Sequence, residues 1–566
     1  MRRTYLLFGL FGALAFGACS SEDAAMSAGS AERSEDSWGW NGEEGDGGGA
    51  PAADPSMPDD EGTSSTSDCF SMECPVGFYC ESGACVPEVP EAGLTSYRYL
   101  YFLEKSKRRI MRIDASEFQV DARETGLAPM DMKILPGGER LVLVDASHTV
   151  EVIDLEGSVE ERIIWDTVRS LSHLKVSPTG EHVALFYDWD DPRALDRQSE
   201  PGNINQISIL AVGESTTMED DDEHLVDISV GLLPRDVHFS SDGTKVVVIG
   251  RRSVTSVDLR SVEEGVAAPS DTVDIDEAAV EFLVNAAASE VLLRFNADDR
   301  LEFVNLQTGD ETELCFGGNI TDITSIGGDE FLVAFSGPDE NYLSRVDFSE
   351  AAAGCPVVPG QYSIGEAQTI VYDEASDRAL AYTADASVET LWFVDFAQET
   401  QQELRLEKAV AALAFADNGG TVRITHLKTA GTPAWNPGFP DYEPTDLSID
   451  KSNGVSWIDL ATGLQRLTLR NDAFGPYGFA PGTAERAGST FQALTEDSGP
   501  RLLVVEHSAR FNESWIDLAS ETVHMGYIPA TDSIYAIQDH PMGRVTFVDA
   551  RTHSLRHVTG YALDLN

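Results

Sequence analysis

The residues from Arg235 to Leu259 read Arg235-Asp-Val-His-Phe, Ser240-Ser-Asp-Gly, Thr244-Lys-Val-Val-Val-Ile, Gly250-Arg-Arg-Ser and Val254-Thr-Ser-Val-Asp-Leu. Apolar residues alternate with polar ones or run together over five positions, and Asp242-Gly243 is a turn dipeptide. This pattern predicts three short β-strands joined by tight turns. We expect one further strand after Leu259 to complete the unit.

The ending Val257-Asp258-Leu259 recurs along the chain as Ile or Val, then Asp or Asn, usually followed by Leu or Phe. Further copies are Ile113-Asp114, Ile153-Asp154-Leu155, Val304-Asn305-Leu306, Val346-Asp347-Phe348, Val394-Asp395-Phe396, Ile458-Asp459-Leu460, Ile516-Asp517-Leu518 and Val548-Asp549, and Ile207–Ala211 fills one gap without the acid. Successive spacings are 40, 57, 47, 47, 42, 48, 64, 58 and 32 residues. The mean is close to the ~40–50 residues of a four-stranded propeller blade.

The sequence therefore predicts an all-β chain whose residues 96–566 form a β-propeller of four-stranded blades, with eight to ten repeat units. Arg98 to Thr125 supplies only three strands, and Tyr561 to Asn566 supplies one, so we expect these two segments to complete one blade and close the ring. The pattern resembles the WD40 and YVTN propeller families over the last 470 residues, without Gly-His and Trp-Asp at regular positions. Such a resemblance implies an architecture and no particular chemistry.

The N-terminus has the features of an export signal. Arg2 and Arg3 precede an apolar run from Tyr5 to Phe16, which is the length of a secretory h-region and too short to span a membrane. Phe16-Gly-Ala-Cys19 resembles the bacterial lipobox, although the Phe departs from the usual Leu or Val, and an ordinary signal peptidase site is the alternative. The resemblance implies removal of residues 1–18 and acylation of Cys19. Ser20 and Ser21 lack the Asp that retains such lipoproteins in the inner membrane, which implies an outer-membrane destination.

Residues 19–68 consist mainly of Gly, Ser, Ala, Pro and acidic residues, so we expect a disordered acidic linker. Residues 69–87 hold four cysteines, Cys69, Cys74, Cys80 and Cys85, and resemble the EGF-like and Dickkopf-like cysteine-rich stubs of surface proteins. Two disulfides of unassigned connectivity are expected here. A zinc site is the competing interpretation, but no C-x2-C pair is present.

The chain has seven cysteines, and if Cys19 carries lipid, six remain to pair in an oxidising compartment. After the stub, Cys315 and Cys355 are left for each other. Both fall in or just before the fourth strand of neighbouring repeat units, so we expect one disulfide that joins adjacent blades. The alternative is a pair of buried free thiols.

The composition excludes several function classes. The 96 acidic against 39 basic residues give a net charge of −57, which repels phosphate backbones and makes nucleic-acid binding untenable. Charged residues make up 24% of the chain, which excludes a membrane-embedded body and leaves the lipid anchor as the membrane contact. Searches for hydrolase, metalloprotease and P-loop motifs find none. No cofactor or metal is expected.

Two repeat units carry long insertions between their second and third strands, at 188–203 and 432–450. Exposed loops of this kind carry recognition, and aromatic side chains make binding anchors. The candidate partner-binding residues are Trp189, Trp435, Phe439 and Tyr442. The alternative is that these aromatics pack on their own blades. The acidic run 219–223 is expected to be a solvated loop, and weak Ca²⁺ binding there is the alternative.

Anchor, linker, stub and propeller together indicate a non-catalytic lipoprotein of the outer membrane, at the cell surface, whose propeller binds a protein or a glycan. One alternative is a periplasm-facing propeller lipoprotein that assists outer-membrane protein assembly. Another is a lactonase-like or quinoprotein-like propeller enzyme, whose site would be assembled from one residue per blade and would be invisible as a motif.

Overall fold

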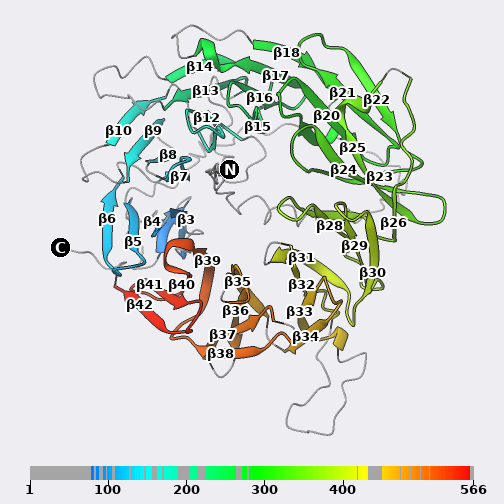
Figure 1. The fold of residues 1–566 in the computed structure, drawn as a ribbon. Helices are drawn as coiled ribbons and strands as arrows, with labels where there is room; N and C mark the ends of the chain where they lie inside the picture. Colours follow the sequence, from blue (N-terminus) through cyan, green and yellow to red (C-terminus); the bar gives the residue numbers. More distant parts are fainter. Residues whose placement is uncertain are drawn as a thin grey trace, which may run out of the picture. The chain divides into compact units, whose positions relative to one another are not determined.

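The computed structural model describes residues 78–87 and 94–560, apart from gaps of which the longest are 189–203, 213–224 and 431–448. Within these residues the chain forms ten four-stranded antiparallel sheets and one two-stranded sheet. The ten sheets follow one another as blades around a ring, with the first strand of each toward the middle and the fourth at the outside (Figure 1). The predicted all-β propeller is therefore confirmed, at the upper end of the expected eight to ten units.

Each blade consists of four consecutive strands paired in sequence order. Blade 1 is β3 (Leu94–Ser96), β4 (Tyr99–Glu104), β5 (Arg109–Asp114) and β6 (Val120–Glu124), and blade 2 is β7 (Pro129–Ile134), β8 (Arg140–Asp145), β9 (Thr149–Asp154) and β10 (Arg162–Asp166). Blade 3 is β11 (His173–Val176), β12 (His182–Phe186), β13 (Gln206–Ala211) and β14 (Leu225–Ser229), and blade 4 is β15 (Asp236–Phe239), β16 (Lys245–Ile249), β17 (Ser253–Asp258) and β18 (Ser270–Asp274). Blade 5 is β19 (Ala279–Val284), β20 (Glu290–Phe295), β21 (Arg300–Asn305) and β22 (Glu311–Cys315).

The second half of the ring repeats this arrangement. Blade 6 is β23 (Ile320–Ser325), β24 (Glu330–Ser336), β25 (Asn341–Asp347) and β26 (Tyr362–Gly365), and blade 7 is β27 (Thr369–Asp373), β28 (Arg378–Tyr382), β29 (Thr390–Asp395) and β30 (Thr400–Arg405). Blade 8 is β31 (Val410–Ala416), β32 (Thr421–His426), β33 (Asn453–Asp459) and β34 (Gln465–Arg470), and blade 9 is β35 (Phe474–Ala480), β36 (Ser489–Glu496), β37 (Gly499–Glu506) and β38 (Glu513–Asp517). Blade 10 is β39 (Thr522–Ile528), β40 (Ser533–Gln538), β41 (Arg544–Asp549) and β42 (Leu555–Thr559), and short 3-10 turns occur at η5 (Leu259–Ser261), η6 (Phe348–Glu350) and η7 (Pro529–Thr531).

The recurring Asp or Asn has a structural role at the end of the third strand. The Asp459 carboxylate accepts hydrogen bonds from the backbone N–H and the hydroxyl of Thr462, at 2.8 and 2.9 Å. Asp549 accepts from Thr552, and Asn305 from Thr308, in the same way. The side chain thus closes the turn into the fourth strand, which is a local device that a sequence displays directly.

The copy of this ending at Ile516-Asp517 does not end a third strand. Ile516 and Asp517 end β38, a fourth strand, whereas the third strand of blade 9 ends at Glu506. Taking Glu506 as the blade 9 position, Asp459 to Glu506 is 47 residues and Glu506 to Asp549 is 43, so the irregular intervals of 58 and 32 disappear. Blade 9 carries a Glu in place of the shorter acid, which is why its own third strand escaped the pattern.

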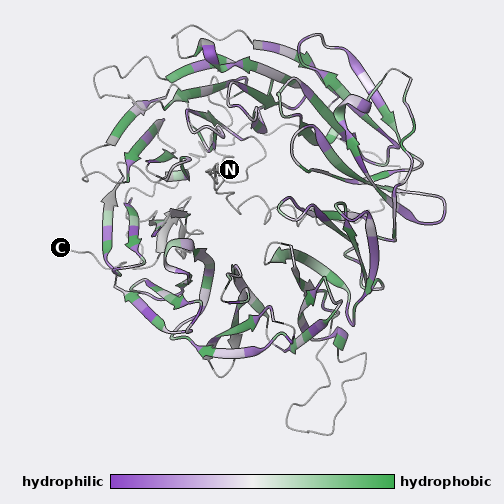
Figure 2. Cartoon of the chain, viewed as in Figure 1, coloured by the Kyte–Doolittle hydropathy of each residue, from purple (hydrophilic) through white to green (hydrophobic). Residues whose placement is uncertain are grey.

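The core of the molecule is divided among the contacts between blades. Each of ten clusters of buried apolar residues combines side chains of two neighbouring blades. Apolar residues concentrate on the middle strands of the blades, whereas outer strands such as β30 carry many hydrophilic residues (Figure 2). Because every blade is covered on both faces by its neighbours, the ring is stabilised by the burial of sheet faces against one another.

Ring closure differs from the expectation. Blade 1 supplies its own first strand, β3, and blade 10 is complete with β42, so no blade is shared between the two ends of the chain. Side-chain packing closes the ring instead: Leu100 and Phe102 of blade 1 lie in one buried cluster with Ile537 and Phe547 of blade 10. The expectation that 98–125 lacks a fourth strand overlooked Leu94–Ser96, and residues 561–566 lie outside the described part of the chain.

The structure describes only a small part of the N-terminal region, residues 78–81 and 84–87. Strands β1 (Phe78–Glu81) and β2 (Ala84–Pro87) pair antiparallel with Cys80 opposite Cys85. Cys19, Cys69 and Cys74, with the signal segment and the linker, lie outside the described residues. Among the helices that the structure describes, none is long and apolar enough to cross a membrane.

Candidate functional site

One face of the ring carries the two insertions singled out in the sequence. Strands alternate in direction within a blade, so the connections between strands two and three share a face with the connections from blade to blade. The blade 3 insertion leaves β12 after Phe186 and returns at Gln206, and the blade 8 insertion leaves β32 after His426 and returns at Asn453. Trp189, Trp435, Phe439 and Tyr442 lie outside the described residues, as does the run 219–223, so their roles stay predictions.

The base of the blade 8 insertion is built around a buried lysine. Lys408 is 1% exposed, and its ammonium donates a hydrogen bond to the carbonyl of Asp450, 2.8 Å away, where the insertion re-enters the blade. The N–H of Thr429, on the outgoing side, donates to the same carbonyl at 2.9 Å. Burial lowers the pKa of Lys408. Both ends of the insertion are therefore tied to one fixed point on the ring.

His426 completes this base. Its Nδ1 lies 2.9 Å from the carbonyl oxygen of Lys408 and 3.1 Å from that of Ala409, so Nδ1 carries the proton and donates. Its Nε2 then accepts from the Ser456 hydroxyl at 2.6 Å. Burial lowers the pKa of His426 to about 4, so the ring stays neutral and keeps this tautomer across physiological pH.

A buried guanidinium, that of Arg423, lies on β32, the strand that ends at His426. Arg423 is 4% exposed, and its Nε donates to Gln492 of blade 9 at 3.0 Å while Nη1 donates to Thr425 at 2.9 Å. The guanidinium carbon lies 3.7 Å from the centroid of the Tyr477 ring. Burial lowers the pKa of Arg423 to about 10. These partners are neutral, so the cation is solvated by an amide, a hydroxyl and a π face rather than by a carboxylate.

Sequence reasoning missed Lys408, Arg423 and His426. A signal existed in β32, which reads Thr421-Val-Arg-Ile-Thr-His and places a cation in the middle of a second strand. The corresponding strand of blade 4 reads Lys245-Val-Val-Val-Ile, with its cation at the first position. A charged residue inside an otherwise buried strand is the informative departure.

The base of the blade 3 insertion has a different character. Ser172 Oγ accepts the N–H of Asp188 at 2.9 Å on the outgoing side. On the returning side the N–H of Leu233 donates to the carbonyl of Ile204 at 2.6 Å, which brings the blade 3 insertion next to the connection into blade 4. Ile204 and Leu232 are 42% and 54% exposed. Two aliphatic side chains are therefore presented to solvent beside the insertion.

Blades 3 and 4 share a cluster of titratable side chains on their first strands. Asp236 lies 3.4 Å from the Lys175 ammonium and 3.1 Å from His238 Nε2. Burial alone would raise the pKa of Asp236, but the hydrogen bond from His238 and the charges of His238 and Lys175 outweigh it and hold that pKa well below its usual range. In the described part of the chain, no three His, Cys, Asp or Glu side chains gather so as to hold a metal ion.

The disulfide between Cys315 and Cys355 is confirmed, with the two Cα atoms 5.3 Å apart. Cys315 ends β22 of blade 5, and Cys355 lies in the connection between β25 and β26 of blade 6, so the bond joins adjacent blades as expected. Cys355 has a left-handed backbone with φ of 53°, preceded by Gly354 at 92°. This turn lets the connection lean across to its neighbour.

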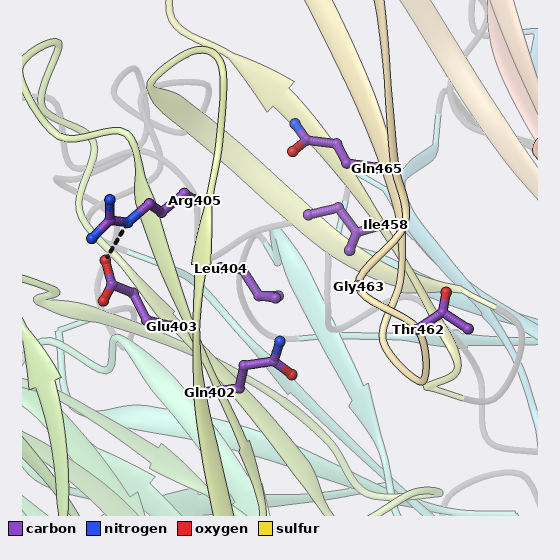
Figure 3. A pocket seen from close by; sticks show the side chains of 8 residues that line it. All are labelled: Gln402, Glu403, Leu404, Arg405, Ile458, Thr462, Gly463 and Gln465. Atoms are coloured by element: carbon purple, nitrogen blue, oxygen red, sulfur yellow. Dashed lines mark hydrogen bonds and ion pairs between the residues drawn. The ribbon is translucent and has the colours of Figure 1, made fainter.

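A cavity of about 390 Å³ opens between blades 7 and 8. Leu404 of β30 and Ile458 of β33 are its buried lining residues, and Gln402 and Gln465 lie on opposite sides of it (Figure 3). Glu403 and Arg405, on β30, pair at 3.3 Å. The cavity therefore combines buried apolar side chains with amide and charged groups at its sides.

Comparison with known proteins identifies no family for this chain. No family model matches the chain, and no curated protein matches it. Among solved structures, a chain described as the eukaryotic initiation factor is 10% identical, with 75% of this chain and 96% of that chain covered and a TM-score of 0.46. Dihydro-heme d1 dehydrogenase NirN in complex with DHE is 12% identical, with 68% and 76% covered and a TM-score of 0.35. Similarities at this level say nothing about the function of this chain.

Proposed function

We propose that this chain is an exported, lipid-anchored binding protein whose propeller holds a protein or glycan partner at the outer membrane, without catalysis. The observation that carries the proposal is the base of the blade 8 insertion, where Lys408, His426 and Asp450 fix both ends of the inserted segment to the ring. Binding loops are generally mounted on rigid scaffolds in this manner. The exposed Ile204 and Leu232 beside the blade 3 insertion add apolar area on the same face.

The export and anchoring part of the proposal rests on the sequence. The apolar run before Cys19 and the small residues beside it supply the signal, and several acyl chains on one cysteine give a stable anchor at ~0.8 kcal/mol per buried methylene. The net charge of −57 keeps the body away from anionic headgroups. The propeller would then act in the aqueous space beside the membrane, at the end of the acidic linker.

The binding experiment uses full-length protein in detergent micelles, applied to arrays of surface glycans and of purified outer-membrane proteins. The variant Trp435→Ala/Phe439→Ala/Tyr442→Ala should lose at least tenfold in affinity for whatever the wild type binds, because aromatic anchors dominate binding energy. Leu464→Ala, at the turn between β33 and β34, is the matched control and should bind normally. Equal binding by the triple variant would remove the blade 8 insertion from the proposal.

Location is tested on intact cells. A surface-facing propeller should be released by added protease, and Cys19→Ala should release the protein from membranes altogether. Protection of the propeller from protease would favour the periplasm-facing alternative. A wild-type N-terminus other than Cys19 would refute the lipid anchor.

A further inference from the structure

The outer edge of blade 5 is already extended by a segment from the next blade. The backbone N–H and C=O groups of Glu313, in β22, face those of Ala352 at 3.5 and 3.4 Å. The N–H of Cys315 donates to the carbonyl of Pro356 at 3.0 Å, and the N–H of Val358 donates to the carbonyl of Cys315 at 2.8 Å. The bridge at Ala352 is antiparallel and the bridge between Cys315 and Val357 is parallel, so the segment reverses at Gly354 and Cys355 and its extended part is residues 356–358. The molecule therefore contains one worked example of a segment from a neighbouring blade added to a blade edge.

The added segment also fills the space between the blades. Val358 is 6% exposed and packs in one buried cluster with Leu314 of β22 and Phe348 of blade 6. The segment is long enough to do this because 14 residues, 348–361, join β25 to β26. One β-branched side chain thus inserts into the opening, while its backbone pairs with the edge strand.

On blade 7, no segment among the described residues occupies the same positions. Cys315 pairs with the first residue of β21, Arg300, and in the same register Arg405 pairs with the first residue of β29, Thr390. Arg405 and Glu403 therefore correspond to Cys315 and Glu313. Leu404 corresponds to Leu314.

At these two positions the outward backbone groups of β30 have no partner among the described residues. The N–H of Leu406 donates to the carbonyl of Glu389 at 2.8 Å, which makes Leu406 a hydrogen-bonded position of the pair formed by β29 and β30. Because such positions alternate along an antiparallel pair, Glu403 and Arg405 direct their N–H and C=O groups outward. No other strand within the described residues pairs with this edge of β30.

The opening exists because the next blade has a short connection. Five residues, 460–464, join β33 to β34 in blade 8, against the 14 residues in blade 6. These five residues close their own turn around Asp459 and lie at the side of the cavity (Figure 3). The cavity of about 390 Å³ is lined by Leu404 and Ile458. These residues hold the strand positions of Leu314 and Val346, which pack with Val358 between blades 5 and 6.

We propose that the outer edge of β30 binds a segment of a partner protein by backbone pairing, in the way that β22 binds residues 351–359. The partner segment would have the chemistry of residues 351–359: small residues that turn the chain, then a β-branched apolar side chain between prolines, with its apolar group on Leu404 and Ile458. The site lies on the outer rim, apart from the face that bears the two insertions. It does not depend on the anchoring or on the partner proposed above.

The test uses a fluorescein-labelled peptide, Ala-Ala-Ala-Gly-Ser-Pro-Val-Val-Pro, which copies residues 351–359 with Ser in place of the cysteine. Full-length protein should bind it saturably, and amide exchange at Glu403 and Arg405 should slow when the peptide is present. The same peptide with Asp in place of the second Val should bind at least tenfold more weakly, because a carboxylate would lie on the apolar floor.

Three protein variants separate backbone pairing from other contacts. Glu403→Pro removes one outward N–H, and proline is tolerated on edge strands, so this variant should fold and bind at least tenfold more weakly. Its matched control, Glu403→Ala, keeps the N–H and should bind within twofold of wild type. Gln402→Trp fills the cavity and should also abolish binding if the proline variant proves unstable by circular dichroism.

Three outcomes would overturn the proposal. The first is an absence of saturable peptide binding to the wild type at millimolar peptide. The second is equal binding by wild type, Glu403→Pro and Gln402→Trp, which would place the peptide elsewhere. The third is a concentration-dependent self-association that Gln402→Trp abolishes, which would assign the edge to a second copy of this chain rather than to a partner protein.

Discussion

Blades 5 and 6 meet through phenylalanine side chains, whereas blades 8 and 9 meet around a buried guanidinium. The first interface buries Phe303, Phe316, Phe331, Phe335 and Phe348 in one cluster. Several of these rings contact each other edge-on or tilted, with centroids 5.0 to 6.0 Å apart. A disulfide and an added strand segment seal the outer edge of the same interface.

The interface between blades 8 and 9 has the smallest of the ten apolar clusters, with six buried residues. Arg423 stacks on Tyr477 near the middle of the ring, and Arg470 stacks on Trp515 near its outside, 4.6 Å from the ring centroid. Glu513 of blade 9 accepts from Arg466 at 2.7 Å. Cation–aromatic stacking and hydrogen bonds therefore stabilise this interface, whereas the burial of apolar area stabilises the other.

The two interfaces differ in how many polar side chains they bury. Every blade must cover both faces of its sheet, but the cover need only exclude water and satisfy the groups it buries. A buried charge costs more than an apolar side chain of the same size unless hydrogen bonds replace its hydration. The interface between blades 5 and 6 should therefore supply more stability, and that between blades 8 and 9 should be the more replaceable.

The largest effect is expected from Phe331→Ala in the aromatic cluster. Phe331 is fully buried, so its removal loses transfer free energy and leaves a cavity, at a cost of ~3–5 kcal/mol in the free energy of unfolding. Denaturant unfolding of the full-length protein measures it. Trp515→Ala, a 38% exposed aromatic at the other interface, is the control and should cost about 1 kcal/mol or less. Equal losses for the two variants would abolish the comparison.

The next effect concerns the disulfide. Replacing Cys315 and Cys355 together with Ser frees a loop spanning 40 residues, which costs about 3–4 kcal/mol in the chain-entropy model. Val358 remains buried in the aromatic cluster, so the added segment should stay on β22 in the folded variant. Amide exchange at position 315 of the variant and at Val358 checks this. Fast exchange at both positions would mean that the disulfide alone holds the segment.

Much of the fold was predictable because its repeat rests on a local device. Asp258, Asn305 and Asp459 each bond within the turn that follows them, so a third-strand ending is visible without knowledge of distant contacts. Blade 9 lacked the device at Glu506, and a chance copy at Asp517 displaced the assignment. The disulfide was predictable for a related reason, since both cysteines hold definite places relative to those endings.

The candidate sites were less predictable because their partners are distant in the sequence. Arg423 meets Gln492 across 69 residues, and Lys408 meets Asp450 across 42. The cavity beside β30 depends on the length of the connection in blade 8, which acquires meaning only by comparison with blade 6. A single sequence shows the residue types, but it does not show which side chains of neighbouring blades come into contact.

A third prediction tests a polar contact beside the aromatic interface. The Asp322 carboxylate accepts the N–H of Ile370 from blade 7 at 2.7 Å. Burial raises the pKa of Asp322 to about 7, helped by the charge of Glu281 and opposed by that hydrogen bond and by Arg294. A carboxyl whose pKa is higher folded than unfolded stabilises the fold below its unfolded pKa, and this stabilisation is lost as pH rises from about 4 to about 7.

Asp322→Asn keeps an oxygen for Ile370 and cannot ionise, so its stability should change less over this range. At 1.36 kcal/mol per pKa unit, the wild type should lose ~2–4 kcal/mol relative to the variant between pH 4.5 and 7.5. Unfolding free energies of both proteins at the two pH values measure the difference. Parallel pH profiles would show that Asp322 ionises as freely in the folded chain as in the unfolded one.

The smallest net effect is expected from Arg423→Met at the polar interface. Methionine retains most of the length of the side chain and its contact with Tyr477, and it removes a charge whose burial is costly. Gln492 loses its donor but still donates to the carbonyl of Gly475 at 2.6 Å, so one amide oxygen is left to be satisfied, at a cost of about 1–3 kcal/mol. The gain from removing the charge offsets this cost, and Arg423→Met should lie within about 1 kcal/mol of the wild type. Arg423→Met/Gln492→Leu removes the unsatisfied amide oxygen but takes the donor from the Gly475 carbonyl, so its stability should be close to that of Arg423→Met, whereas Arg423→Ala leaves a cavity and should cost more than either. A loss above 3 kcal/mol for both Met-containing variants would mean that the guanidinium, and not the packing around it, holds blades 8 and 9 together.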